Sequence, residues 1–448
     1  MRPNVWPTAC ALAAAALLSA LPAMASDMVI EPAEPDEYVE IPERGEVVAE
    51  DGGERLDALQ PQVFLRGGLW SHSRDFTDPG AVSVAGLVVR AAPRLGSGLD
   101  AYGEARAQAD STGRGDVDLE EGWLRFTGGP ARLIVGRQIV AWGRADRLNP
   151  TDVIGARDYT RLLASDDEQR RGALIAQVTY GAGPWTVSAF WLPEFRPNRF
   201  PVDRSRPGVV ILDDQQVEDR SQFAARIDHT GGALDWSISY FEGRSRTRDI
   251  ALVPVPPAMA RVALAAVQQQ FPQTTVFGAD LAGVAGRFGY RAEAAYTDVG
   301  GAATPFRTKD NFWIVVGVDR TFDSGWNVNL QYSFRYIVDY EDPALLPNPV
   351  VRAIALQSAA VNNQLDRRQN GMTLRVARTW MNERLEFETS AAGYFETRDV
   401  AIRPRLSYAL TDSTRAVLGA DVFLGPQLSY FGRVRDLSAA YAQIVYGF

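Results

Sequence analysis

The residues best suited to chemistry lie close together between Gly136 and Gly172, where arginines alternate with carboxylates. The carboxylates could transfer protons or bind a cation, and the arginines could bind carboxylates or other anions in bidentate fashion. Asn149-Pro150-Thr151-Asp152 has the composition of a turn that redirects the chain. The charged residues of the stretch are Arg137, Arg144, Asp146, Arg147, Asp152, Arg157, Asp158, Arg161, Asp166, Asp167, Glu168, Arg170 and Arg171.

Catalysis would need a nucleophile or base that this chain scarcely offers. Its one cysteine is Cys10, near the N-terminus, and its two histidines are His72 and His229. His229 falls in the turn-like sequence DHTGG, and Ser71 and Ser73 point away from His72 if their strand persists, because neighbouring strand residues alternate faces. We therefore predict no enzymatic activity.

Clustered carboxylates also suit a hard cation, so calcium bound by Asp166, Asp167 and Glu168 is an alternative for this stretch. Once Cys10 is removed with a signal peptide, no thiolate is left to bind a metal. The prediction is that the chain carries neither a metal nor a cofactor.

The N-terminus predicts export. The apolar run ALAAAALLSALPAMA ends in Ala23-Met24-Ala25, a small-x-small pattern typical of signal-peptide cleavage, so residues 1–25 are expected to be a signal peptide. A membrane anchor is the alternative, but the run is shorter than the roughly 20 residues that span a bilayer. A lipoprotein is disfavoured because Cys10 precedes the run.

The next segment, residues 26–60, is strongly acidic and rich in proline. Twelve acidic residues and two arginines between Asp27 and Asp57 give it a net charge of −10. Such a composition cannot form a core, so we expect a disordered periplasmic segment, with docking to a periplasmic partner as the alternative.

The elements that would position the charged groups are β-strands, because the remaining apolar residues follow a period of two. In GWNVNLQYSFRY (325–336) apolar and aromatic residues alternate with Asn, Gln, Ser and Arg. Similar alternation occurs in ALDWSISYF and PWTVSAFW, and other polar faces carry charge, as at Arg291 with Glu293 and at Arg403 with Arg405. Each strand therefore has one apolar and one polar face.

A soluble sandwich and a membrane barrel both use such strands, and three features favour the barrel. The strand-like stretches are about ten residues long, as a tilted membrane-crossing strand requires. Aromatic residues lie near strand ends, and short connections alternate with long ones. Eight short turns and nine longer loops predict an all-β, transmembrane antiparallel barrel of about 18 strands, with 16–18 plausible, over residues 61–448. The even count places both ends in the periplasm.

The C-terminal sequence AYAQIVYGF supports this prediction. Ile444, Tyr446 and Phe448 share one face, and the last residue is aromatic, as in the C-terminal signal read by the barrel-assembly machinery. We therefore expect the outer membrane of a Gram-negative bacterium, where membrane lipids surround the barrel. Nucleic acid is not an expected partner, because residues 58–448 carry no net charge.

The loop over residues 138–171 follows the fifth expected strand. In general porins, which this layout resembles, that loop folds inward and narrows the channel. Such folding requires the charges to pair or stay hydrated; an outward loop of surface salt bridges is the alternative. The expected constriction and pore-lining residues are Arg137, Arg144, Asp146, Arg147, Asp152, Arg157, Asp158, Arg161, Arg291, Glu293, Arg335, Arg375, Arg403 and Arg405.

These features predict passive passage of small hydrophilic solutes through a porin-like channel. The alternative is a transporter of lipid-like, hydrophobic or polysaccharide molecules that works with periplasmic partners. Two proline-bounded stretches, 256–272 and 347–364, are expected to be short helices on the barrel rim, and an apolar mouth formed by them would favour that alternative.

The sequence VGRQIVAWGRADRLNPTDV, with FWLPEFRPNRFP downstream, resembles a group of proteobacterial outer-membrane barrels of unknown function that are compared with porins and alginate-export channels. The resemblance is carried by Arg137-Gln138, Trp142-Gly143 and the Asn149-Pro150-x-Asp152 turn. It covers some sixty residues and implies transport. Members of the group are often longer than this chain.

Overall fold

The computed structural model describes residues 61–448, apart from residues 75, 77–79, 203–207, 213, 216, 218–220 and 262. The expected signal peptide (1–25) and acidic segment (26–60) lie outside the described residues, as does the side chain of Asp167.

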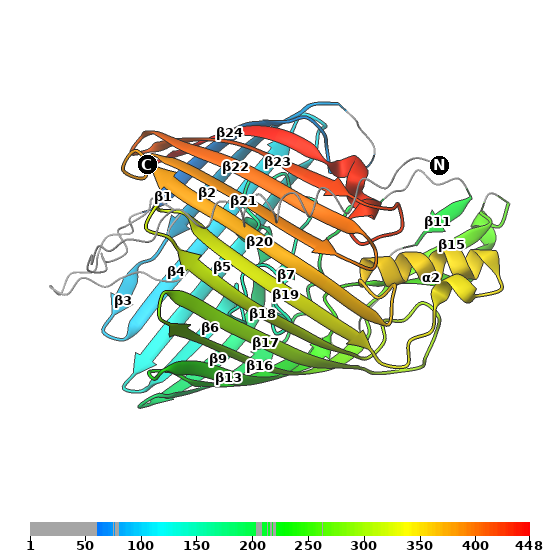
Figure 1. Cartoon of the computed structure of the whole chain (residues 1–448), viewed down its shortest axis with the longest axis horizontal. Helices are drawn as coiled ribbons and strands as arrows, with labels where there is room; N and C mark the ends of the chain where they lie inside the picture. Colours follow the sequence, from blue (N-terminus) through cyan, green and yellow to red (C-terminus); the bar gives the residue numbers. More distant parts are fainter. Residues whose placement is uncertain are drawn as a thin grey trace. The chain divides into compact units, whose positions relative to one another are not determined.

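Within the described residues, eighteen strands form one closed antiparallel barrel (Figure 1). Each strand pairs with its neighbours along the chain, and the last pairs with the first, from Phe64 opposite Gly447 to Trp70 opposite Tyr441. The predicted fold class is confirmed. The strands are β1 (Gln62–Trp70), β2 (Val82–Ala91), β4 (Leu99–Asp110), β5 (Gly115–Gly128), β6 (Ala131–Gln138), β9 (Ala173–Ala182), β10 (Trp185–Leu192), β12 (Gln222–His229), β13 (Leu234–Arg244), β16 (Gln273–Ala285), β17 (Phe288–Val299), β18 (Asn311–Thr321), β19 (Asn327–Ile337), β20 (Arg368–Trp380), β21 (Leu385–Tyr394), β22 (Asp399–Thr411), β23 (Thr414–Leu424) and β24 (Ala439–Gly447).

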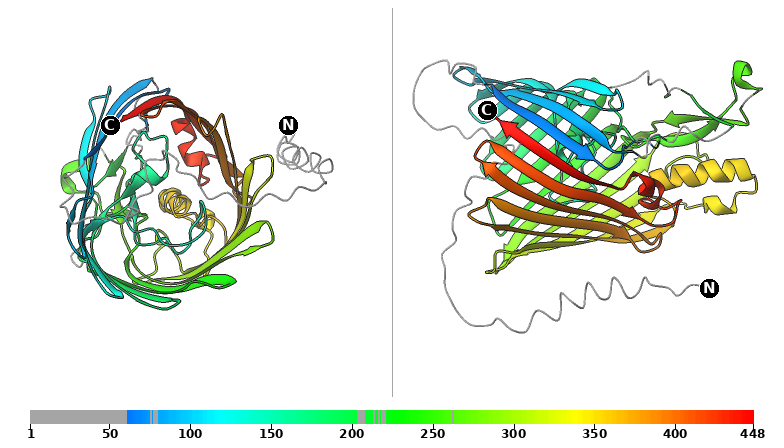
Figure 2. Two further views of the ribbon diagram at one scale, coloured as in Figure 1. Left: turned by 90° about the vertical axis from the view of Figure 1, so that its left-hand side faces the viewer. Right: turned by 90° about the horizontal axis from the view of Figure 1, so that it is seen from above.

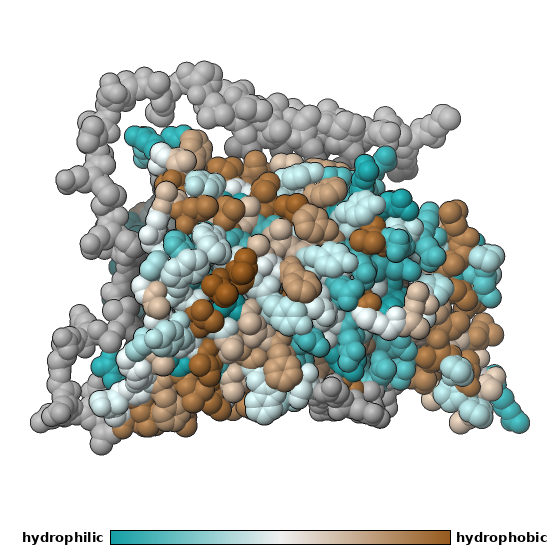
Figure 3. Space-filling model, turned by 90° about the horizontal axis from the view of Figure 1, so that it is seen from below, coloured by the Kyte–Doolittle hydropathy of each residue, from teal (hydrophilic) through white to brown (hydrophobic). Residues whose placement is uncertain are grey.

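The barrel wall is apolar outside and polar inside, which reverses the arrangement of a soluble protein. On β19, Leu330 and Tyr332 are exposed, whereas Asn329, Gln331 and Ser333 are buried on the inner face. Figure 3 shows apolar side chains spread over the outward wall. A lipid bilayer covers such a surface, and closure leaves no strand edge with unpaired backbone groups in it. No helix of the described residues has the length and apolarity needed to cross a membrane.

Short turns lie at one end of the barrel and long loops at the other. The turn between β5 and β6 has two residues, 129–130, as does the turn between β9 and β10, 183–184. The longest connections are residues 139–172, 193–221, 245–272 and 338–367. Alternating short and long connections were predicted and are confirmed.

Part of the long loops forms a small sheet outside the barrel. The strands β11 (Val209–Ile211), β15 (Ala265–Gln270) and β14 (Asp249–Val253) pair with one another, and helix α2 (Pro349–Val361) packs against β14. The predicted helix at 347–364 is confirmed, and the Asn348 side chain caps it by accepting from Val350 N and Val351 N.

The helix predicted at 256–272 is wrong. The described residues of this stretch form the short 3₁₀ turn η2 (Pro257–Met259) and the central strand β15 (Ala265–Gln270) in place of a helix. Pairing with β11 and β14 satisfies the backbone of β15 on both sides, and this tertiary pairing overrides the helical propensity of its alanines and glutamines.

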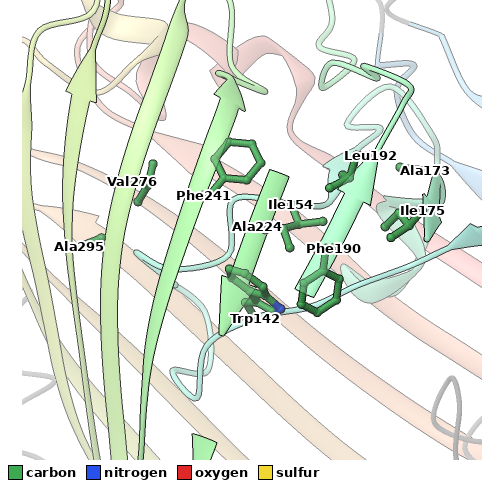
Figure 4. Packing of buried hydrophobic residues seen from close by; sticks show 10 residues of the cluster. All are labelled: Trp142, Ile154, Ala173, Ile175, Phe190, Leu192, Ala224, Phe241, Val276 and Ala295. Atoms are coloured by element: carbon green, nitrogen blue, oxygen red, sulfur yellow. The ribbon is translucent and has the colours of Figure 1, made fainter. Parts of the chain in front are cut away.

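An apolar cluster inside the barrel holds the loop between β6 and β9 against the wall (Figure 4). Trp142 and Ile154 come from this loop, and the remaining members are inward-facing residues of neighbouring strands. Trp142 packs edge-on against Phe190, with ring centroids 5.3 Å apart. The cluster comprises Trp142, Ile154, Ala173, Ile175, Phe190, Leu192, Ala224, Phe241, Val276 and Ala295. Because Trp142 and Ile154 are buried in this cluster, the charged residues between them are held near the wall.

Candidate functional site

The segment 139–172, called the lumen loop below, lies inside the barrel. In the end-on view of Figure 2 the wall encloses it. Side chains from widely separated strands bond to it, including Arg66 of β1, Glu293 of β17 and Arg403 of β22. Since β1 and β17 lie on opposite sides of the ring, a segment that reaches both crosses the lumen.

Glu293 holds the start of the lumen loop. Its carboxylate accepts from the backbone N–H groups of Arg144 and Ala145 and from Thr151 Oγ1 at 3.1 Å. Gly143 precedes these donors with φ at +93°, and a Cβ there would overlap the Glu293 carboxylate. The Trp-Gly pair noted in the sequence thus allows close approach of the backbone to a buried carboxylate.

Arg144 and Arg147 then bond to carboxylates of the wall. Arg144 Nε donates to Asp280 at 2.7 Å. Arg147 bridges Asp166 of the lumen loop, at 2.9 Å, and Glu388 of β21, at 2.8 Å. An arginine between two carboxylates is held in one orientation, because its N–H donors form a rigid fork.

The far part of the lumen loop is bound by arginines of the wall. Asp166 pairs with Arg403 as well as with Arg147, and Glu168 pairs with Arg66 through Nη2 at 2.6 Å. Burial by itself would raise the pKa of Asp166, but Arg403 and Arg147 outweigh it and lower the pKa to about 2. Asp166 is therefore ionised throughout the physiological range.

A β-bulge in β5 supplies a carboxylate that the sequence did not reveal. The register of β4 against β5 shifts at Glu104 and Ala105, so that Glu120 is skipped between Glu121 and Leu119. Glu120 and Glu121 are both buried, at 0% and 6% exposure, although consecutive strand residues normally face opposite sides. Glu120 pairs with Arg161 of the lumen loop.

Most of the other residues expected in the constriction bond to the lumen loop or to the wall beside it. Asp152 accepts from Trp142 N and pairs with Arg157 and Arg170, all within the lumen loop. Arg137 donates to Gly172 O, and Asp158 pairs with Arg161 and Arg199. Arg291 donates to Arg144 O at 3.0 Å. Arg375 and Arg405 converge on Glu388 from β20 and β22, and the charge of Asp146 acts on Arg375.

Arg335 belongs to a different group at the outer end of the lumen. It stacks on Trp313 at 4.0 Å and donates to the Asn362 carbonyl. Arg248 and Arg433 both lie over the ring of Phe200, at 5.1 and 5.9 Å. We call Arg248, Arg335 and Arg433 the outer cationic cluster.

Within the described part of the chain, no member of the outer cationic cluster forms an ion pair with a carboxylate. Burial and the neighbouring charge of Arg433 outweigh the opposing charge of Asp214 and lower the pKa of Arg248 to about 10, which still leaves it charged at neutral pH. The cluster therefore places guanidinium groups against aromatic rings without a salt bridge among the described residues, whereas the lumen loop pairs its arginines with carboxylates.

The residues considered for metal binding and for catalysis have other partners in the structure. The side chains of Asp166 and Glu168 are bound by guanidinium groups rather than directed at a common point, and no group of three metal-binding side chains occurs among the described residues. His229 stacks with Trp236 and packs edge-on against Trp185, and His72 Nδ1 bonds to the Ser73 carbonyl.

Ile444, Tyr446 and Phe448 are all exposed, and their role in assembly stays a prediction.

Comparison with solved structures identifies the fold. The chain is similar to Pseudomonas aeruginosa OccK11 (OpdR), with 14% identity, a TM-score of 0.52, and coverage of 88% of this chain and 96% of that one. It is similar to P. aeruginosa OpdK, solved with vanillate, with 11% identity, a TM-score of 0.52, and coverage of 88% of this chain and 99% of that one. It is also similar to Acinetobacter baumannii OccAB3, with 10% identity, a TM-score of 0.51, and coverage of 87% and 99%. No family model and no curated protein matches the chain. The chain thus has the eighteen-stranded barrel fold of outer-membrane porins.

Proposed function

We propose that this protein is a porin-like channel of the bacterial outer membrane, through which small hydrophilic solutes pass by diffusion. The observation that carries the proposal is the lumen loop, which crosses a polar barrel interior with its charges bound to the wall. An eighteen-stranded barrel is wide enough to hold water, so a loop across it narrows a pore rather than filling a core. The polar wall disfavours lipid-like solutes.

The loop and the wall would set selectivity at two levels. At the lumen loop, Arg144 and Arg147 face carboxylates, so both signs of charge line the path. At the outer cationic cluster, guanidinium groups that form no salt bridge among the described residues would attract anions, and the neighbouring aromatic rings would stack on planar anions. OpdK, which shares the fold, was solved with vanillate, an aromatic carboxylate. We infer that small anions are preferred here.

Single-channel recording in planar bilayers tests the proposal. The native chain is expected to conduct ions, and absence of conductance at high protein loading would contradict the channel. Cys10 is the only cysteine, so in a C10S background a thiol introduced by R147C is unique. A charged thiol reagent should then change the conductance if the lumen loop lies in the ion path.

The matched control for this experiment is L418C, on the exposed outer face of β23. Modification there should leave conductance unchanged, because the thiol faces lipid. Equal conductance before and after modification of R147C, with labelling verified by mass, would place the lumen loop outside the ion path.

A further inference from the structure

A cavity of about 310 Å³ lies at the outer rim of the barrel, between the small outer sheet and the loop over residues 300–310. It is lined by the last residue of β13, the junction of β15 with β16, and the loop after β17. The lining residues with polar side chains are Gln215, Arg244, Asp249, Gln270, Gln273, Thr304 and Arg307.

Two of these residues face away from the lumen. Arg244 and Gln273 are opposite each other in the β13–β16 ladder. Strand alternation puts them on the same face as Tyr240 and Phe277, whose rings contact each other with centroids 5.3 Å apart. Aromatic residues on the outer face mark the boundary between hydrocarbon and headgroups. The cavity therefore lies at headgroup level, just beyond that boundary.

The cavity wall is rich in hydrogen-bond donors. Arg307 donates to the Ala302 carbonyl at 3.1 Å, while its buried Nε has no hydrogen-bond partner among the described residues. Arg244 donates to the Phe271 carbonyl at 2.9 Å. The Asp249 carboxylate accepts from Thr308 and Asn362. This N–H is a donor that a bound anion in the cavity could satisfy, alongside the guanidinium of Arg244.

We propose that this cavity binds the phosphate-bearing sugar headgroup of an outer-leaflet lipid. Phosphate oxygens match the two guanidinium groups, and the glutamine amides and the threonine hydroxyl suit sugar hydroxyls. The acyl chains would lie along the exposed side chains of Ile238 and Phe277 below the cavity. This inference rests on the membrane position given by the proposed function, and it does not depend on channel activity.

Native mass spectrometry of the full barrel tests the site, with diphosphorylated lipid A, its dephosphorylated form and inorganic phosphate as probes. The wild-type chain should retain the diphosphorylated lipid. R244A/R307A should reduce the bound fraction by about tenfold, because two charge-assisted contacts are lost. R307K, which keeps the charge without the fork, should lie between them. R287A is the matched control, since Arg287 is exposed and bonds to Asp323 on the turn between β18 and β19.

Equal retention of both lipid forms, or equal retention by R244A/R307A, would overturn the proposal. If inorganic phosphate binds as well as the diphosphorylated lipid, the site is one for a free anion and the lipid proposal is wrong. Circular dichroism melting verifies that each variant is folded. Conductance of R244A/R307A should equal that of the native chain, so failure of the lipid site and failure of the channel give different results.

Discussion

Single carboxylates and guanidinium groups decide how the lumen loop is held. Glu293 receives several donors from one short segment, and Glu388 receives arginines from three elements. Glu388 is bound by guanidinium groups and Glu293 by neutral N–H and O–H donors, so removing either carboxylate leaves buried donors unsatisfied, which costs free energy. Substitutions at these residues should therefore affect the loop far more than substitutions at exposed charges.

Replacing Glu293 by Ala should release the start of the lumen loop. The backbone N–H groups of Arg144 and Ala145 lose their acceptor, which we expect to weaken the local structure by about 1–3 kcal/mol. Hydrogen exchange of residues 143–152 should accelerate, and single-channel conductance should rise and fluctuate more. E242A is the control, because Glu242 is exposed on the outer face and accepts from the Tyr240 hydroxyl there. Unchanged exchange in E293A would refute this anchoring role.

Replacing Arg144 and Arg147 by Ala should shift ion preference toward cations. Asp280, Asp166 and Glu388 each lose a bound guanidinium, so negative charge on the path is left less compensated. Reversal potentials in a salt gradient measure the shift, with R287A at an exposed turn as the control. The same reversal potential in all three proteins would contradict the assignment.

At the level of elements, loops and strands are joined by a few buried polar groups. Asp249 at the start of β14 accepts from Thr308 of the loop 300–310 and from Asn362 at the end of α2. Ser358 of α2 donates to Phe306 O and accepts from Ile250 N. These bonds connect three loops into one outer assembly.

The stability of this outer assembly should depend on pH through Asp249. Burial raises the pKa of its carboxyl to about 6 from an ordinary value near 3.8, because the bonds from Thr308 and the charge of Arg307 compensate only in part. The folded state then binds more protons than the unfolded state between these values. The contribution of Asp249 to the free energy of unfolding is fully present below about pH 4 and is lost as the pH rises through 6. The loss amounts to about 3 kcal/mol.

Hydrogen exchange of residues 249–253 and 300–310 should therefore be faster at pH 7.5 than at pH 4.5, after correction for the intrinsic rate. D249N removes the titrating group and should abolish this difference. A pH dependence that persists in D249N would assign the effect to another group.

Much of the fold was predictable from sequence, because strand alternation is a local signal. The apolar period at Leu330 and Tyr332 specifies the outer face of β19 without knowledge of any partner. The bulge at Glu120 was not predictable, because it depends on the register of β4 against β5. Stretch 256–272 was misassigned for a similar reason: its strand exists through pairing with segments distant in the sequence.

The candidate site was predictable to a similar depth. The density of charge between Arg144 and Glu168 indicated a loop that folds into the lumen. The spacing of residues in the sequence does not show that Glu293 accepts from the start of this loop, or that Arg335 lies outside the group of residues that bind it. Those partners are defined by where the loop crosses the lumen, which depends on the apolar cluster around Trp142.

At the scale of the whole molecule, the bilayer should penalise charge on the outward wall. L418R introduces a charge at the middle of β23, where Leu418 is 56% exposed, and should destabilise the barrel by about 2–4 kcal/mol. Reversible urea unfolding in vesicles measures the change. L345R makes the same substitution on a loop, where Leu345 is exposed to water, and should cost little. Equal stability of the two variants would argue against a membrane-embedded wall.

The pairing of β24 with β1 joins residues from the two extremes of the described chain. Without the nine-residue strand β24, the facing edges of β1 and β23 would carry backbone N–H and C=O groups without hydrogen bonds. Such groups are costly in the hydrocarbon of a bilayer. Closure of the barrel thus depends on β24, which lies farthest from β1 along the described chain. A chain shortened by that strand would not be a smaller channel but an open sheet prone to aggregate.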